Sequence, residues 1–249
     1  MLQQTPVSRV LPRWRRFLDR WPTPEACAAS PLEEVLREWA GLGYPRRAVA
    51  LWRCASRIGG HAGGAPPGWP REEAGLRALP GIGPYTARAL LVLALGEPSP
   101  TPRDVNIARV AARCFLGVEA APARRLDAAL EAARPDGMPR RDYTLALFDV
   151  GALLCRRRSV ACGSCPLGAG CRSRDRLATA GIPAPRRRQP SYTGSMRELR
   201  GAVLRALLAR PGLGLAELEA AVASVPLACR PGAVAEAVHG LARDGLLPG

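Results

Sequence analysis

The sequence predicts an all-α fold, and three observations support this prediction. No segment shows the alternation of apolar and polar residues that is typical of half-buried strands. Apolar residues recur instead at helical spacing, as at Val10, Trp14 and Phe17. The stretch Ser30-Pro31-Leu32-Glu33 has the serine N-cap, first-turn proline and capping-box glutamate that begin a helix.

Helices are expected in order along the chain, separated by glycine- and proline-containing breaks. The helix that begins after Ser30 should end near Trp39, because Gly41-Leu42-Gly43-Tyr44 interrupts the pattern. A second glycine- and proline-rich break covers residues 59–69. The remaining expected helices span 46–58, 71–79, 84–96, 105–116, 122–134, 139–155, 197–209, 215–223 and 232–244.

A length of 249 residues suits one compact domain with a small appendage. The main domain is expected over 1–175 and includes a cysteine-containing loop over 155–171. A basic linker is expected over 176–196, because it contains the stretch Ala184-Pro185-Arg186-Arg187-Arg188. The tail, 197–249, fits a helix-turn-helix or winged-helix fold, with a helical appendage that has no DNA role as the alternative.

The composition predicts a polyanionic partner. The formal charge is +15, and all 36 basic residues are arginine. Nucleic acid is the first expectation and an anionic membrane surface the second, while an arginine-rich chain without such a partner is the alternative. The absence of lysine excludes a side-chain Schiff base. No apolar run approaches the ~20 residues of a membrane span, and no signal peptide is recognisable, so a cytosolic protein with reduced thiols is expected.

Four cysteines form the array Cys155-x6-Cys162-x2-Cys165-x5-Cys171, which is typical of a metal centre. The unequal spacing favours an iron–sulfur cluster, and zinc is the alternative. Between the first two cysteines lie Arg156, Arg157 and Arg158, which a metal centre could present to a phosphate backbone. The remaining cysteines are expected to be packed core thiols: Cys27, Cys54, Cys114 and Cys229.

The stretch Leu79-Pro80-Gly81-Ile82-Gly83 lies between two expected helices. Its glycines permit a tight turn with positive φ, and the amides near 84–86 could hold a phosphate. This is the arrangement of a helix-hairpin-helix DNA anchor, and an ordinary helix connection is the alternative. About twenty residues on, Asp104 is placed to cap the next helix. A carboxylate there could also stabilise the sugar cation that forms when an N-glycosidic bond breaks.

These motifs, in this order, resemble the helix-hairpin-helix DNA glycosylases related to endonuclease III, and more closely the adenine DNA glycosylases. The resemblance covers residues 1–175. The segments that carry it are Met1-Leu2-Gln3-Gln4-Thr5, Gly41-Leu42-Gly43-Tyr44, the hairpin from Leu79 to Thr86, Asp104-Val105-Asn106, and Phe148-Asp149-Val150-Gly151-Ala152.

The resemblance implies a helix-hairpin-helix glycosylase fold, a [4Fe-4S] cluster on the four array cysteines, and excision of a flipped adenine mispaired with 8-oxoguanine or guanine. Asp104 would face the sugar as the catalytic carboxylate. Gln3 and Gln4 would line the gap in the base stack, and Tyr44 would wedge beside the oxidised guanine. Further DNA contacts are expected at Leu2, Gly81, Gly83, Tyr85, Thr86, Asn106, Arg156, Arg157 and Arg158.

Two departures from the family pattern modify these expectations. The family's catalytic glutamate lies two residues before the Met-Leu-Gln-Gln-Thr motif, which here begins at Met1. A misplaced start is the favoured explanation, with truncation and a catalytically impaired homologue as alternatives, and slow adenine cleavage by the sequence as given is expected. The tail is also too short to be the separate domain with which larger members recognise 8-oxoguanine.

Tyr85 occupies the hairpin position where lyase members carry lysine, so a monofunctional glycosylase is expected. The alternatives are a mismatch-specific thymine or uracil glycosylase and a non-catalytic iron–sulfur DNA-binding protein. The expected partner is double-stranded DNA with a mismatched or oxidised base pair. A monomer in the bacterial cytoplasm, associated with the nucleoid and not with a membrane, is expected.

Overall fold

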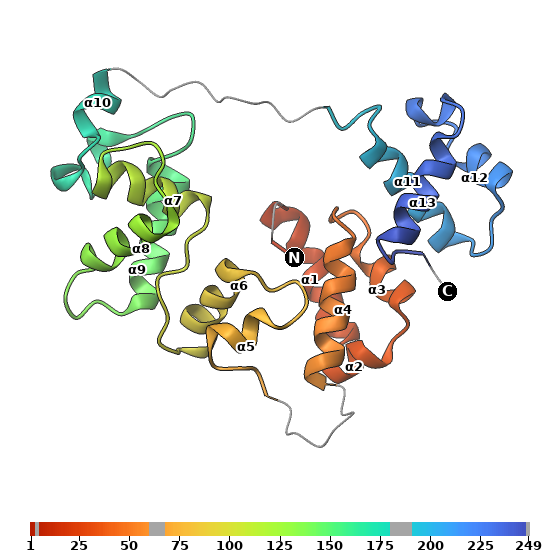
Figure 1. Ribbon diagram of the computed structural model, residues 1–249, viewed down its shortest axis with the longest axis horizontal. Coiled ribbons are helices and arrows are strands. Elements are labelled where there is room, and N and C mark those ends of the chain that lie inside the picture. The colour runs from red at the N-terminus through yellow and green to blue at the C-terminus, as the bar shows by residue number, and fades with distance from the viewer. Residues whose placement is uncertain (3–4, 60–67, 180–190, 248–249) are drawn as a thin grey trace. The chain divides into compact units, whose positions relative to one another are not determined.

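The computed structural model describes residues 1–2, 5–59, 68–179 and 191–247, and within these ranges it contains helices and no strand (Figure 1). An isolated antiparallel bridge joins Cys155 to Val160. The all-α prediction is therefore confirmed. No helix among the described residues is long and apolar enough to cross a membrane.

By its internal contacts the chain forms two compact units. Unit 1 comprises Met1–Trp69, Leu79–Gly81 and Gln189–Gly249, and unit 2 comprises Pro70–Ala78 and Ile82–Arg188. The boundary passes through the hairpin sequence at residues 81–82. The three-part division expected from the sequence stays a prediction, but described residues of 191–247 share a core with described residues of the N-terminal helices.

Unit 1 brings together helices from both ends of the chain. Its helices are α1 (Val7–Arg20), α2 (Pro24–Ala29), α3 (Leu32–Trp39), α4 (Arg46–Gly59), α11 (Met196–Ala209), α12 (Leu215–Ala221) and α13 (Ala233–Arg243). One apolar core contains Val35 and Trp39 of α3 together with Leu199 and Val203 of α11. The residues 191–247 contain no strand, so the wing of a winged helix does not form there.

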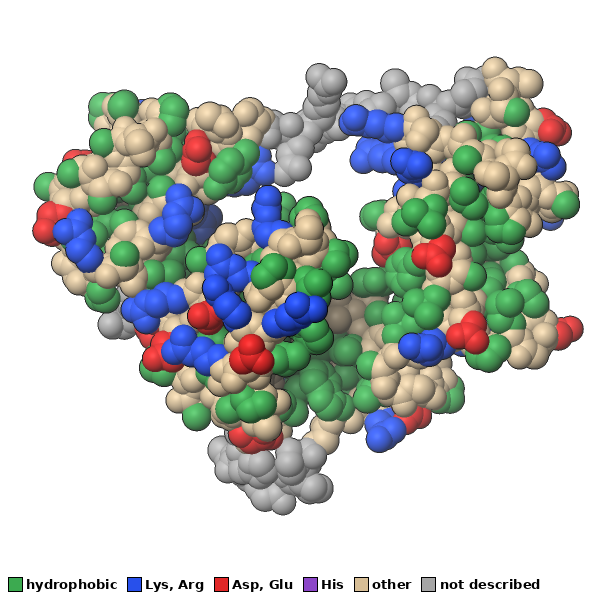
Figure 2. Space-filling view, turned by 180° about the vertical axis from the view of Figure 1, so that it is seen from behind, with side chains coloured by type: hydrophobic (Ala, Val, Ile, Leu, Met, Phe, Trp, Pro, Cys, Tyr) green, Lys and Arg blue, Asp and Glu red, His purple; other side chains and the backbone are tan. Residues whose placement is uncertain are grey.

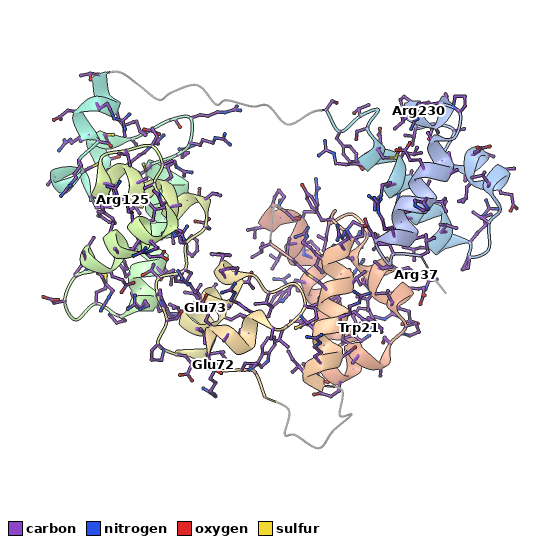
Figure 3. The ribbon with its side chains drawn as sticks, viewed as in Figure 1. Trp21, Arg37, Glu72, Glu73, Arg125 and Arg230 are labelled. Carbon is purple, nitrogen blue, oxygen red and sulfur yellow. The ribbon has the colours of Figure 1, made fainter. Side chains whose placement is uncertain are left out.

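Polar contacts also join the tail to the N-terminal helices. Arg37 of α3, labelled in Figure 3, donates from Nε to the Leu208 carbonyl oxygen at 3.1 Å. Asp244 accepts a hydrogen bond from Arg200 of α11 and lies 3.8 Å from the Arg46 guanidinium of α4. These contacts make the tail an integral part of unit 1.

The helix starts differ from the sequence prediction at Ser30. Thr23 caps α2 through a hydrogen bond from the Ala26 amide at 3.2 Å, and Ser30 ends α2. The Ser30 hydroxyl donates to the Ala26 carbonyl oxygen and accepts from the Trp21 indole, so it is not available to cap α3. The predicted N-cap role of Ser30 is therefore wrong, because two earlier partners compete for the hydroxyl.

Unit 2 contains α5 (Glu73–Arg77), α6 (Pro84–Ala89), α7 (Val105–Val110), α8 (Ala123–Ala132), α9 (Arg140–Asp149) and α10 (Arg174–Thr179). Three of the expected long helices change to a π-helical turn near their ends. These turns are Leu90–Leu95, Ala111–Phe115 and Val150–Leu154. π-helical turns are rare in proteins, and those that occur are often found near functional sites. A second apolar core, with Ile107, Leu130 and Leu147 among its members, includes residues of the second and third of these turns.

Candidate functional site

Asp104 begins α7 as its N-cap, as the sequence predicts. Its backbone is extended, at φ −84° and ψ −174°. Its Oδ1 accepts hydrogen bonds from the Asn106 and Ile107 amides, both at 2.8 Å. The carboxylate therefore satisfies two of the amides that a helix start leaves without helical partners, and the side chain has a fixed orientation.

The second oxygen of Asp104 begins a hydrogen-bond network that reaches the cysteine array. Asn106 Nδ2 donates to Asp104 Oδ2 at 3.0 Å, and Arg109 Nη2 donates to Asn106 Oδ1 at 2.9 Å. Arg109 also donates to the carbonyl oxygens of Gly151 at 2.7 Å and Cys155 at 2.8 Å. Two side chains thus connect the candidate catalytic carboxylate to the first array cysteine.

Close packing of two segments makes this network possible. A Cβ atom on Gly151 would lie 2.9 Å from Asn106 Cβ and 3.2 Å from the Asn106 carbonyl carbon. Any side chain at position 151 would therefore separate α7 from the π-helical turn before Cys155. Arg109 could not be selected from the sequence, because the carbonyl oxygens of Gly151 and Cys155 that it binds lie more than forty residues away in the chain.

Tyr85 lies in the first turn of α6, on the helix that follows the hairpin. Burial raises the pKa of the Tyr85 phenol, and the negative charge of Asp104 raises it further. The structure therefore places the hairpin tyrosine within electrostatic reach of Asp104. A phenol with a raised pKa stays protonated at neutral pH and can donate a hydrogen bond.

The hairpin depends on one of its two glycines for its shape. Gly81 has φ +77°, and a Cβ atom there would lie 2.7 Å from Ala50 Cβ of α4. Gly83 has φ −90° and open space around it, so the tight turn does not require glycine at that position. The expectation of positive φ therefore holds for Gly81 and is wrong for Gly83.

The four array cysteines line one cavity, together with the apolar side chains of Val110, Val150, Leu154, Val160, Leu167 and Leu177. Short 3-10 turns at Cys162–Ser164 and Gly168–Gly170 separate the last three cysteines. Among the described residues, no group of three or more His, Cys, Asp or Glu side chains is arranged to hold one metal ion. The four thiols therefore line the same cavity, but they are not arranged to coordinate one metal ion.

A fifth thiol lies against the same cavity. Cys114 is 5% exposed, and burial together with the neighbouring Cys171 raises its pKa to about 12. Cys27 and Cys54 are also buried, but Cys229 is exposed, so its predicted place in the core is wrong. Cys229 is the last residue of the short 3-10 turn Pro226–Cys229, which has no buried member.

A buried arginine, Arg113, also contacts the first array cysteine. Its Nη1 lies 3.8 Å from Cys155 Sγ and donates to the Arg156 carbonyl oxygen at 3.0 Å. Its Nε and Nη2 donate to Glu119 Oε2 at 3.0 and 2.8 Å, and Arg176 binds the other oxygen. Burial opposes ionisation of Glu119, but the two arginines hold its pKa below the ordinary value.

The arginine loop, Arg156–Arg158, is exposed and has fixed ends. The Cys155–Val160 bridge closes it, and the Ala161 amide donates to the Leu154 carbonyl oxygen at 2.9 Å. Basic side chains also cover other parts of the described surface, with acidic side chains between them (Figure 2). The three consecutive arginines are available to a polyanion.

The N-terminal candidate residues lie in unit 1. Leu2 is 60% exposed and Tyr44 is 48% exposed, while Gln3 and Gln4 lie outside the described residues. Tyr44 follows Gly43 in the loop between α3 and α4. Arg47 contacts the carbonyl oxygen of Gly43 and the ring of Tyr44. Its role could not be recognised from the sequence.

Both a family model of DNA repair proteins and a curated DNA glycosylase match this chain. A family model described as HhH-GPD superfamily base excision DNA repair protein matches residues 1–135. A curated protein of Mycolicibacterium smegmatis named adenine DNA glycosylase is 43% identical over 82% of this chain and 68% of its own length.

Two solved structures share the fold. A thermostable thymine-DNA glycosylase has a TM-score of 0.61 and 26% identity, covering 70% of this chain and 80% of that one. A trapped endonuclease III–DNA covalent intermediate has a TM-score of 0.59 and 23% identity, covering 71% and 81%.

Proposed function

Because the chain belongs to the HhH-GPD superfamily of base excision DNA repair proteins, we propose that it is an N-glycosylase that removes adenine from mismatched DNA. The fixed carboxylate of Asp104 is the observation on which the proposal rests. The mycobacterial relative, named adenine DNA glycosylase, supports the choice of base.

Asp104 suits the stabilisation of a sugar cation. Its two oxygens accept three hydrogen bonds, all from its own helix start. A carboxylate has about four acceptor positions, so one remains for the reacting sugar. When the bond between adenine and deoxyribose breaks, positive charge develops on the sugar, and a fixed negative charge nearby lowers the barrier.

Hydrolysis without strand cleavage fits the side chains available. The sequence contains no lysine, and Tyr85 stands at the hairpin position of the lyase nucleophile. A phenol cannot form a Schiff base with the opened sugar. We therefore assign a monofunctional reaction that leaves an abasic site in the duplex.

A [4Fe-4S] cluster on Cys155, Cys162, Cys165 and Cys171 is part of the proposal. The residues fit such a group, because four thiols share a cavity with apolar walls and Arg113 donates toward Cys155. When bound, the cluster would supply structural support and not chemistry on the base. It would fix the arginine loop, which would bind DNA phosphates.

The proposed DNA contacts belong to three places in the fold. The hairpin, with Gly81, Gly83 and Thr86, would bind phosphates through backbone amides. Leu2, Gln3, Gln4 and Tyr44 would occupy the base stack around the mismatch. Tyr85 and Asn106 would lie beside the extruded adenine. The proposed substrate is a duplex with adenine opposite 8-oxoguanine or guanine, bound by a monomer.

A second candidate function is removal of thymine or uracil opposite guanine. It is favoured by the 26% identity with the thermostable thymine-DNA glycosylase and by the tyrosine at position 85. The two candidates differ in the base that is released and share the role of Asp104.

Single-turnover assays with excess protein test the proposal on duplexes that carry adenine, thymine or uracil in defined mismatches. We expect slow release of adenine alone, and loss of that release in Asp104→Asn. Release of thymine or uracil would favour the second candidate. Tight binding without release of any base over several hours would contradict both and favour a non-catalytic DNA-binding protein. Iron and acid-labile sulfide in anaerobically purified protein test the cluster separately.

A further inference from the structure

The loop between α3 and α4 has an unusual backbone. Gly41 has φ +86°, Gly43 has φ +74°, and Tyr44 has φ +50°. Tyr44 is the only residue other than glycine with positive φ among the described residues. A bulky side chain in this region is strained, and such strain persists only where surrounding contacts enforce it. Contacts from surrounding residues must therefore hold the exposed Tyr44 in this conformation.

Arg47, in the first turn of α4, supplies contacts to the loop from inside. Its Nη2 donates to the carbonyl oxygens of Gly43 at 3.2 Å and Leu42 at 3.4 Å. Its guanidinium carbon lies 5.2 Å from the centroid of the Tyr44 ring and 5.5 Å from that of Trp39. Both distances are within the range of cation–π attraction. One side chain thus holds the backbone before Tyr44 and the ring of Tyr44.

The same guanidinium joins the loop to the N-terminal segment. Arg47 Nη1 donates to the Met1 carbonyl oxygen, and Nη2 donates to Thr5 Oγ1, each at 3.2 Å. Thr5, which is buried, donates from Oγ1 to the Leu42 carbonyl oxygen at 2.9 Å. The segment that contains Gln3 and Gln4 is therefore anchored at both described ends through Arg47 and its partner Thr5.

We propose that Arg47 is a positioning residue for mismatch recognition, because it holds Tyr44, Met1 and Thr5 in one fixed arrangement before DNA binds. The inference rests on the proposed function, in which both segments enter the base stack. Preorganisation lowers the ordering cost of the specific complex, in which Tyr44 is inserted. It leaves contacts with phosphates on paired DNA unchanged.

The chemistry of arginine explains why this position is sensitive to a conservative change. The planar guanidinium donates in several directions at once and stacks on aromatic faces. A lysine keeps the charge but offers one compact ammonium group, which cannot reach Met1, Thr5 and Gly43 together while contacting two rings. Arg47→Lys therefore separates positioning from charge.

The experiment measures affinities for a duplex with adenine opposite 8-oxoguanine and for a fully paired duplex, by fluorescence anisotropy at one salt concentration. The variants are Arg47→Lys, Tyr44→Ala and the double variant, with Arg53→Lys as control. Arg53 is exposed on the same helix. We expect Arg47→Lys to lower the ratio of mismatch to paired affinity roughly tenfold, with paired affinity unchanged. Arg53→Lys should keep the wild-type ratio.

The double variant gives the sharper test, because residues that act as one unit are not additive. We expect its loss of the ratio to be smaller than the sum of the two single losses, because Arg47 acts partly through Tyr44 and partly through Met1 and Thr5. Additive losses would overturn the inference. The inference would also be overturned if Tyr44→Ala lowered the affinity ratio while Arg47→Lys kept the wild-type ratio. That result would leave the proposed function intact. A wild-type ratio in both single variants would instead remove the role of Tyr44 from the proposed function, and the inference with it.

A structural role alone is distinguished by thermal unfolding. A lower melting temperature of Arg47→Lys with an unchanged affinity ratio would overturn the inference. If Arg47→Lys fails to fold, Thr5→Val takes its place, because it keeps the shape of the side chain and removes an acceptor of Arg47. Thr5→Val also removes the donor to the Leu42 carbonyl oxygen, so two hydrogen bonds are lost. We expect the ratio to fall by roughly threefold or more, and an unchanged ratio would count against the proposal.

Discussion

At the residue scale, single polar side chains perform several tasks at once. Asp104 begins α7 and orients Asn106, and the same carboxylate is the proposed catalytic group. Arg113 binds a cysteine sulfur, a loop carbonyl oxygen and a glutamate. Substitutions at these positions therefore change both stability and function, and a test must separate the two.

Asp104→Asn separates capping from charge. Asparagine caps a helix about as well as aspartate, so the free energy of unfolding should fall by less than ~1.5 kcal/mol, mainly through the lost bond with Asn106. Without the negative charge, adenine release should slow by at least ~100-fold. Thermal melts and single-turnover rates measure the two effects. Asp104→Ala, which also removes the cap, should melt lower, and wild-type release by Asp104→Asn would contradict the proposed role.

Arg113→Leu tests the support of the cysteine array. The variant removes donors to Cys155 Sγ, the Arg156 carbonyl oxygen and Glu119. The buried Arg113 makes several hydrogen bonds that leucine cannot replace, so the melting temperature should fall. If the four cysteines hold the proposed cluster, the visible absorbance of the cluster should decay faster in air in Arg113→Leu than in wild type. Arg124→Leu, an exposed change at the start of α8, serves as control, and equal decay in the two variants would refute the role.

At the element scale, the hairpin shows how one glycine determines a turn. Gly81 is needed for its positive φ and for its contact with Ala50, whereas Gly83 has an ordinary extended backbone. The two positions form a matched pair, because they belong to one motif and differ in what they require.

Gly81→Ala should lower the free energy of unfolding by ~1–3 kcal/mol, since it combines left-handed strain with a steric clash. Gly83→Ala should change it by less than ~1 kcal/mol. Denaturant titrations of both variants measure the difference. If the hairpin amides bind phosphate, Gly83→Ala should still weaken binding to duplex DNA, because a methyl group obstructs close approach. Equal stability of the two variants would contradict this account of the turn.

Local sequence signals predicted the elements better than the contacts between them. The cap at Asp104 and the break at residues 41–44 depend on neighbouring residues, so they were predictable. The roles of Arg47, Arg109 and Arg113 depend on carbonyl oxygens and sulfur atoms that the fold brings from distant segments, and an arginine-rich chain gives no reason to select three of its 36 arginines. Apolar periodicity likewise does not distinguish an α-helix from its π-helical end.

At the scale of the whole molecule, ion pairs make the fold sensitive to acid. Burial opposes ionisation of Asp127, but hydrogen bonds from Arg103 and Arg88 hold its pKa below the ordinary 3.8. Glu119 behaves in the same way beside its two arginines. A folded-state pKa below the unfolded value means that the stabilisation is present above the unfolded pKa. It is lost as the pH falls through the folded pKa.

The melting temperature should therefore fall as the pH is lowered from about 5 toward 3. Asp127→Asn should melt lower than wild type at pH 7, and the gap should narrow as the pH falls through the lowered pKa of the wild-type carboxyl. Asp142→Asn, an exposed change in the first turn of α9, should follow the wild-type curve. Calorimetry across this pH range checks both, and a constant gap between Asp127→Asn and wild type would contradict the assignment.

The shared core of unit 1 has a consequence for synthesis on the ribosome. Trp39 and Val35 pack in one core with Leu199 and Leu246, so the helices before residue 40 cannot complete their packing until Leu246 has been synthesised. Unit 2, whose segments lie between them in the chain, can close earlier. A nascent chain therefore carries exposed apolar helices at its leading end for most of its elongation. A stop codon shortly before Leu246 would damage the N-terminal helices as much as the tail.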